Sequence, residues 1–137
     1  MKLDRRQAIY TVGGAVLAAA SGASLARPPS LGFLHGVASG DPLQDRIILW
    51  TRVSPQEGHE GLIKVSWEMA RDPAFRRIVR RGATTTSADA DYTVKVDADG
   101  LMPDTAYFYR FKAGGMISPA GRTRTLQVGD VTSVVMA

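Results

Sequence analysis

Apolar and polar side chains alternate along most of the chain from Phe33 onward. The alternation is regular in residues 63–69, 92–98 and 107–112, where Ile, Val, Trp, Met, Tyr and Phe are separated by Lys, Ser, Glu, Thr, Asp and Arg. A period of two places successive side chains on opposite faces of an extended strand. Each of these segments is therefore expected to form a half-buried β-strand.

Turn signals separate the alternating segments at short and even intervals. They are Gly40-Asp41-Pro42, Asp72-Pro73, Arg81-Gly82, Asp99-Gly100, Gly114-Gly115 and Pro119-Ala120-Gly121. With further short strands expected at residues 34–38, 47–53, 77–81 and 122–125, the chain holds about seven strands and no convincing helix. The pattern predicts an all-β fold, a two-sheet sandwich over residues 27–127.

Residues 101–109, Leu-Met-Pro-Asp-Thr-Ala-Tyr-Phe-Tyr, indicate which kind of sandwich this is. They resemble the Leu-x-Pro-x-Thr-x-Tyr segment of fibronectin type III domains. The resemblance implies that the hydroxyl of Tyr107 bonds back to the backbone as a tyrosine corner. It also implies that Trp67 is the matching core tryptophan. The expected fold is a fibronectin type III or immunoglobulin-like β-sandwich.

The first 26 residues differ in character from the rest of the chain. A basic start is followed by an Ala- and Gly-rich apolar stretch at residues 8–20 and by a small-residue cleavage pattern that ends at Ala26. This layout is typical of a removable secretory signal, and the pair Arg5-Arg6 resembles a twin-arginine signal. The stretch is shorter than the roughly 20 residues of a membrane span, so no stable membrane anchor is expected.

Composition narrows the chemistry available to the rest of the chain. The sequence contains no cysteine, which excludes disulfides, thiolate nucleophiles and cysteine metal sites within it. Part of the net charge of +4 belongs to the signal segment, where Lys2, Arg5 and Arg6 outnumber Asp4. The remaining surplus is too small to predict a nucleic-acid-binding protein.

The segment Phe33-Leu-His-Gly-Val-Ala-Ser-Gly-Asp-Pro42, followed by Ile48-Leu-Trp-Thr-Arg52, resembles the N-terminal domain of the PhoD-like alkaline phosphatase family. The resemblance continues in order and spacing through most of the chain after the signal. It includes Val65-Ser-Trp-Glu68, Asp72-Pro-Ala-Phe75, Tyr107-Phe-Tyr-Arg-Phe111 and Ser118-Pro-Ala-Gly-Arg-Thr-Arg-Thr125.

This resemblance implies a division of labour between two domains. The resemblance implies a two-domain enzyme, in which a fibronectin-like sandwich is followed by a metallophosphoesterase domain. The second domain is expected to bind iron and calcium and to hydrolyse phosphomonoesters and phosphodiesters. Residues 128–137 are expected to be a linker and the first strand of that second domain, whose ligand loops the chain does not reach. No catalytic, cofactor-binding or metal-binding residue is therefore assigned here. The expected partners are the missing catalytic domain and the twin-arginine export machinery, and the expected location is periplasmic or secreted.

The residue types that suggest catalysis also have structural interpretations. His35 and His59 lie on separate segments without a carboxylate cluster around either, and His59 is expected to be a solvated loop side chain. Asp41 precedes Pro42, and an Asp at such a position can bond to nearby backbone amides and stabilise a turn. A turn is favoured over calcium there, because calcium takes six to eight oxygen ligands.

Arg46 and Arg52 bracket the expected strand at residues 47–53. They are expected to pair with Asp41 or Asp45 where the sandwich meets its partner domain, since arginine can hold a carboxylate in a bidentate manner. An ordinary exposed ion pair is the alternative. Structural or interface roles are thus assigned to the following residues: His35, Asp41, Arg46, Trp50, Arg52, Trp67 and Tyr107.

Two alternatives remain open from the sequence. The basic run at residues 76–81 could hold a polyanion, although a solvated edge strand protected by its charges is favoured. The chain could also be a free-standing fibronectin-like binding or adhesion module. Against that stands the apolar tail at residues 131–136, which a complete small domain has no reason to expose.

Overall fold

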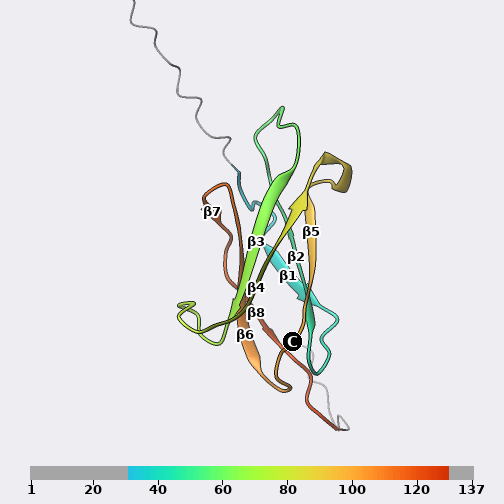
Figure 1. Cartoon of the computed structure of the whole chain (residues 1–137), viewed down its shortest axis with the longest axis vertical. Coiled ribbons are helices and arrows are strands. Elements are labelled where there is room, and N and C mark those ends of the chain that lie inside the picture. Colours follow the sequence, from blue (N-terminus) through green and yellow to red (C-terminus); the bar gives the residue numbers. More distant parts are fainter. Residues whose placement is uncertain (1–30, 130–137) are drawn as a thin grey trace, which may run out of the picture.

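A computed structural model describes residues 31–129 of the chain (Figure 1). The predicted signal residues Arg5, Arg6 and Ala26 and most of the predicted linker at 128–137 lie outside the described residues. Eight strands and one turn of 3-10 helix follow in this order: β1 (Val37–Gly40), β2 (Ile47–Arg52), β3 (Ile63–Ala70), β4 (Ile78–Thr86), η1 (Ala88–Ala90), β5 (Thr93–Ala98), β6 (Ala106–Ala113), β7 (Met116–Ile117) and β8 (Gly121–Arg124).

The strands form two antiparallel sheets that pack face to face. The smaller sheet has the order β1-β2-β5, and the larger has the order β4-β3-β6, with β7 and β8 both pairing with β6. The predicted all-β sandwich is confirmed (Figure 1). Two boundaries were wrong. The first strand begins at Val37 rather than at residue 34, and β4 continues to Thr86 through Arg81-Gly82, which was expected to be a turn but is paired with β3.

The last edge of the larger sheet is divided into β7 and β8 at Pro119, which has no N–H for the ladder. Ser118 bridges the gap. Its Oγ accepts a hydrogen bond from Phe111 N–H (2.9 Å) and donates one to the Pro119 carbonyl (2.8 Å). The buried backbone of β6 therefore stays hydrogen-bonded where the ladder is interrupted.

The core lies between the sheets and contains the inward-facing half of each strand. The large side chains that are almost completely buried come from both sheets: Ile47, Leu49, Val65, Met69, Tyr107 and Phe111. The polar residues between them face outward, as the alternation predicted. Burial of this apolar set supplies the main stabilisation of the sandwich.

Tyr107 makes the contact that gives the tyrosine corner its name. Its hydroxyl accepts a hydrogen bond from Met102 N–H (2.9 Å), while Thr125 Oγ1 donates to the Met102 carbonyl (2.6 Å). The chain thus crosses from β5 in one sheet to β6 in the other with both backbone groups of Met102 satisfied.

Trp67 faces inward on β3 but is only half-buried, so it closes the side of the core rather than filling its centre. Its indole lies over Gly82, the residue paired with it on β4. A Cβ at Gly82 would lie 2.8 Å from Trp67 Nε1. Glycine is therefore required at this position by the close approach of the indole.

We expect Gly82→Ala to lower the free energy of unfolding by about 1–3 kcal/mol, because the added methyl group displaces Trp67. Gly40→Ala is the matched control, since a Cβ at Gly40 meets nothing within 4 Å. That variant is expected to be neutral or up to about 1 kcal/mol more stable. Urea unfolding followed by tryptophan fluorescence measures both, and equal effects would contradict this role of Gly82.

Candidate functional site

The His, Asp and Arg residues between Phe33 and Val53 do not form one cluster. Strand β2 separates them into two groups, one beside Arg46 at its start and the other beside Arg52 at its end. Six residues of extended chain place the two groups about 20 Å apart. Any single catalytic centre built from the whole segment is therefore ruled out by geometry.

Arg46 lies between two carboxylates at the first end of β2. Its Nε is 3.4 Å from Asp45 Oδ1 and its Nη1 is 3.2 Å from Asp97 Oδ2. The hydrogen bond and charge of Asp45, followed by the charge of Asp97, raise the pKa of Arg46 above its usual value. The predicted pairing of Arg46 with Asp45 is present, and Asp97 of β5 is an additional partner.

Asp41 follows β1 in the left-handed region, with φ of 46°. Its carboxylate makes no hydrogen bond with any described residue, so the expected bond to a backbone amide is absent within residues 31–129. Asp41 instead lines a surface hollow of about 590 Å³ together with Leu43, Arg46 and Lys95. The turn at this position thus relies on the tolerance of Asp for a positive φ.

Arg52 holds a second group together at the far end of β2. Its Nη2 donates to Asp91 Oδ1 (2.6 Å), its Nε donates to the Asp91 carbonyl (3.0 Å), and its Nη1 lies 2.8 Å from His35 Nε2. A guanidinium only donates, so His35 Nε2 is the acceptor of this hydrogen bond. The prediction that Arg52 pairs with Asp41 or Asp45 was wrong, because both lie at the opposite end of the strand.

Between these two ends, the outer face of the smaller sheet carries apolar side chains. Ile48 and Trp50 point outward from β2 and are half-buried, and Leu43 beside them is 52% exposed. Trp50 lies between Ala38 of β1 and Lys95 of β5 in the strand register. We call the surface formed by Leu43, Ile48 and Trp50 the apolar strip.

The outer face of the larger sheet holds a buried carboxylate that no sequence motif marked as a functional residue. Glu68 is 8% exposed, and its oxygens accept hydrogen bonds from Arg110 Nε and from Lys112 Nζ (3.0 Å). Burial alone raises the pKa of Glu68, but the hydrogen bonds from Lys112 and Arg110 outweigh it and leave the pKa below its usual value. The Arg110 guanidinium also stacks over the Phe75 ring at 3.9 Å.

Phe75 is positioned for that contact by the turn between β3 and β4. It has a φ of 54°, which is uncommon for a bulky residue. The Asp72 carboxylate accepts hydrogen bonds from the N–H groups of Ala74, Arg76 and Arg77 at 2.7–3.1 Å, and these bonds lower the pKa of Asp72. One feature of the sequence points to the ion-paired group around Glu68. The alternation in β3 and β6 places Glu68, Arg110 and Lys112 on the outward faces of their strands.

The two histidines are both in structural positions, but His59 is not the solvated side chain that was expected. Its ring tilts against Tyr92 at 6.4 Å, its Nε2 is buried, and its carbonyl accepts a hydrogen bond from the Tyr92 hydroxyl (3.0 Å). Within residues 31–129, no three His, Asp or Glu side chains are grouped so that they could hold a metal ion.

Comparison with known proteins identifies the family to which this chain is similar. Residues 18–127 match the protein family described as "PhoD-like phosphatase, N-terminal domain". Alkaline phosphatase D of Bacillus subtilis (strain 168) is 46% identical over 99 residues, which cover 69% of this chain. The chain spans only 17% of the length of that relative.

Solved structures agree with this match. The structure titled "Structure of PhoD" superposes with a TM-score of 0.68 and 42% identity, over 75% of this chain and 20% of that one. The sensor domain of the anti-sigma factor RsgI4 from Pseudobacteroides cellulosolvens superposes with a TM-score of 0.54 at 14% identity, over 75% of this chain and 99% of that one. The second likeness concerns the fold alone.

We expect the free energy of unfolding of Glu68→Gln to fall less steeply with decreasing pH than that of the unaltered chain. The folded-state pKa of Glu68 is lowered, so its ionised form stabilises the fold above the usual carboxyl range, and this contribution is lost as the pH falls through the folded-state pKa. The variant is expected to be about 1–3 kcal/mol less stable at pH 7, and its deficit shrinks as the pH falls below about 4.

Urea unfolding at a series of pH values measures this effect. Asp104→Asn is the matched control, because Asp104 pairs with Arg124 in an exposed position where both side chains are more than half exposed. A deficit of Glu68→Gln that stays constant with pH would contradict the assignment.

Proposed function

Because this chain belongs to the family of PhoD-like phosphatase N-terminal domains, we propose that it is the exported, non-catalytic N-terminal domain of an alkaline phosphatase D-type phosphoester hydrolase. The observation that carries the proposal is the 46% identity to alkaline phosphatase D over 99 residues, which amount to 17% of that protein. The remaining length of such an enzyme is room for a metallophosphoesterase domain that carries out the hydrolysis.

The residues described here do not fit the calcium and iron that the family resemblance implies. The imidazole nitrogen of His35 that faces its neighbours is engaged by Arg52, and Asp91 is held by the same guanidinium. Calcium takes six to eight oxygen ligands, and residues 31–129 bring no such set together. We therefore assign metal binding and phosphoryl chemistry to the catalytic domain.

We assign the apolar strip as the surface on which the catalytic domain docks. Trp50 and Ile48 expose apolar area on a sheet face, and aromatic side chains of this kind are common anchors of protein interfaces. The Arg46 and Arg52 groups lie at the two ends of the strip and are ordered by carboxylates within this chain. They form a polar rim that fixes the orientation of the partner.

Export fits the signal features of the first 26 residues, in which Arg5-Arg6 precede an apolar stretch and Ala26 ends the cleavage pattern. Across residues 31–129 no helix has the length and apolar character needed to cross a membrane. We therefore place the processed protein in the periplasm or outside the cell, with the twin-arginine machinery as its transient partner.

The chain alone is expected to show no turnover of p-nitrophenyl phosphate or bis-p-nitrophenyl phosphate when calcium and iron are supplied. The physical reason is the absence of a convergent ligand set within residues 31–129. A colorimetric assay over an alkaline pH range measures the rate, and His35→Ala is run beside the unaltered chain. Turnover that His35→Ala abolishes would overturn the assignment of hydrolysis to another domain.

A chimera tests the docking surface. Residues 31–129 replace the corresponding domain of alkaline phosphatase D from Bacillus subtilis, and Trp50→Ser is introduced into the chimera. We expect Trp50→Ser to lower the melting temperature of the catalytic part by several degrees, because a docking anchor contributes about 2 kcal/mol or more.

The matched control is Ile117→Ser, which removes an apolar side chain that is 53% exposed on the larger sheet. It is expected to leave both melting temperature and bis-p-nitrophenyl phosphate hydrolysis unchanged. Trp50→Ser is also made in the chain alone, where removal of a half-buried indole should cost about 1–3 kcal/mol, and docking is measured as the loss in the chimera beyond that cost. A chimera that is indifferent to Trp50→Ser would instead favour a free-standing binding or adhesion module.

A further inference from the structure

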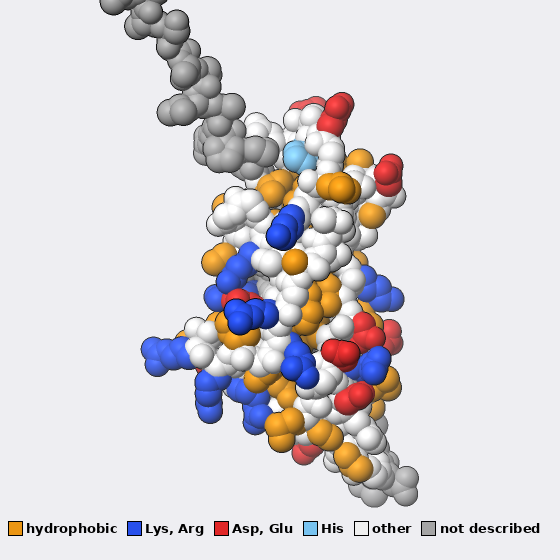
Figure 2. Space-filling model, in the orientation of Figure 1, with side chains coloured by type: hydrophobic (Ala, Val, Ile, Leu, Met, Phe, Trp, Pro, Cys, Tyr) orange, Lys and Arg blue, Asp and Glu red, His pale blue; other side chains and the backbone are white. Residues whose placement is uncertain are grey.

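Positive charge is concentrated on the larger sheet. Its five strands contain one carboxylate, Glu68, against the following cations: Lys64, Arg80, Arg81, Arg110, Lys112, Arg122 and Arg124. Figure 2 shows Lys and Arg gathered on the side of the molecule where β3, β4 and β6 lie, while Asp and Glu gather mainly on the other side. Although the net charge of the chain is small, its cations and carboxylates are thus concentrated on different sides of the molecule.

Internal pairing uses only some of these cations. Arg110 and Lys112 bind Glu68, Arg124 binds Asp104, and Arg80 donates to the carbonyl groups of Asp99 and Gly100. Lys64 and Arg81 are exposed and form no ion pair with any described residue. Because Glu68 has both oxygens occupied, it leaves the charges of Lys64 and Arg81 uncompensated.

The surface around these residues is hollowed into a continuous shallow groove. Three adjoining hollows, the central one about 370 Å³ in volume, share Lys64, Ser66, Ala83 and Lys112 in their linings. Ser66 pairs with Ala83 on one side and with Lys112 on the other, so small side chains form the floor across β4 and β3. We call this feature the cationic groove and define it by Lys64, Ser66, Arg81, Ala83 and Lys112.

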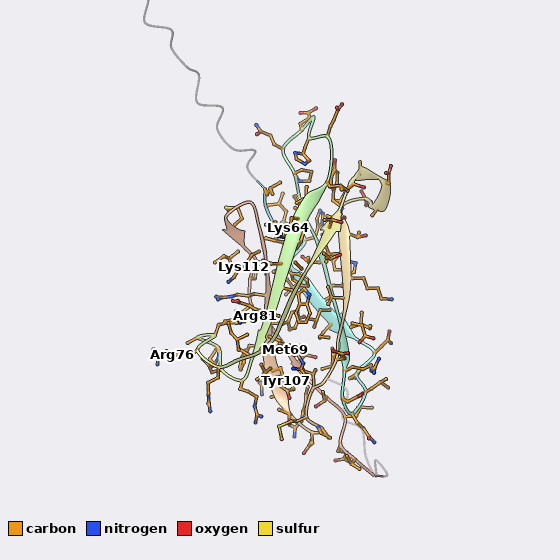
Figure 3. All side chains as sticks on the ribbon, viewed as in Figure 1. Lys64, Met69, Arg76, Arg81, Tyr107 and Lys112 are labelled. Atoms are coloured by element: carbon orange, nitrogen blue, oxygen red, sulfur yellow. The ribbon has the colours of Figure 1, made fainter. Side chains whose placement is uncertain are left out.

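The three cations of the groove lie in successive rows of the sheet. Lys64 is two residues before Ser66, which pairs with Lys112, and Glu68 in the next row pairs with Arg81 (Figure 3). Four residues of strand separate the first and last rows, a distance of about 13 Å. A small anion contacts one or two of these side chains, whereas a chain of anionic groups contacts all three at once.

We propose that the cationic groove binds a linear polyphosphate chain. The charges of the groove match the phosphate groups of such a chain, and neutralising them releases counterions. Single-stranded nucleic acid is disfavoured, because its bases stack on a series of aromatic side chains, whereas the central hollow offers a single one, the half-buried Trp67. A lipid surface is disfavoured because Trp67, the large apolar side chain in the lining of the central hollow, packs half-buried against the core and does not project for insertion. The inference does not require the catalytic domain.

The test measures binding of fluorescently labelled long-chain polyphosphate to the 137-residue chain by anisotropy at several salt concentrations. Lys64→Gln with Arg81→Gln is expected to weaken binding about tenfold at 0.1 M salt and, because two cations are removed, to reduce the slope of log K against log salt by about 1.5 to 2. Pyrophosphate is expected to compete poorly, because it is too short to bridge the rows. Circular dichroism and thermal unfolding confirm that the variant is folded.

Lys95→Gln is the matched control, since Lys95 is an exposed lysine on the outer face of the smaller sheet. It is expected to change affinity less than twofold. Failure of the chain to bind polyphosphate, an equal loss in Lys95→Gln, or equal affinity for oligothymidylate or anionic vesicles would each overturn the proposal. None of these results bears on the docking assignment, which the Trp50→Ser chimera tests separately.

Discussion

The structure depends on one constraint, the burial of every second side chain of β2, β3 and β6 in a single layer between two sheets. Leu49, Val65 and Phe111 are completely buried in that layer. A sandwich about 10 Å thick has no interior space for a polar site, so charged side chains must lie on the outer faces or in the loops. The functional residues of the domain must therefore lie on its surface.

The two outer faces are different in character. The smaller sheet presents the apolar strip, with the ordered Arg46 and Arg52 groups at its ends. The larger sheet presents the cationic groove, in which small side chains lie between exposed cations. Since the faces lie on opposite sides of the core, a domain docked on one leaves the other accessible. The proposed docking of a catalytic domain and the proposed binding of a polyphosphate chain are therefore sterically compatible.

The ion pairs of Glu68 contribute to the stability of the larger sheet. A buried carboxylate is unfavourable by itself, and Arg110 and Lys112 offset that penalty through direct hydrogen bonds. Arg110 in turn stacks on Phe75, whose unusual backbone conformation is stabilised by the hydrogen bonds that the Asp72 carboxylate accepts from the turn. This ion-paired group therefore connects β3, β6 and the β3–β4 turn. Because Glu68 pairs with Arg110 and Lys112, the charges of Lys64 and Arg81 are left without a carboxylate partner among the described residues.

The sequence by itself determined the all-β class and the inward and outward faces of β3 and β6, because both depend on side chains that repeat with a period of two. The contact of Tyr107 followed from the resemblance of residues 101–109 to a fibronectin type III segment. Only the tertiary structure decided which outward residues meet. Arg52 binds Asp91, 39 residues away, and Lys112 binds Glu68, 44 residues away. Strand pairing and register set these contacts, and no local pattern specifies which strands become neighbours. For the same reason the sequence could group His35, Asp41, Arg46 and Arg52 in one segment, whereas the extended geometry of β2 placed them at opposite ends of a sheet.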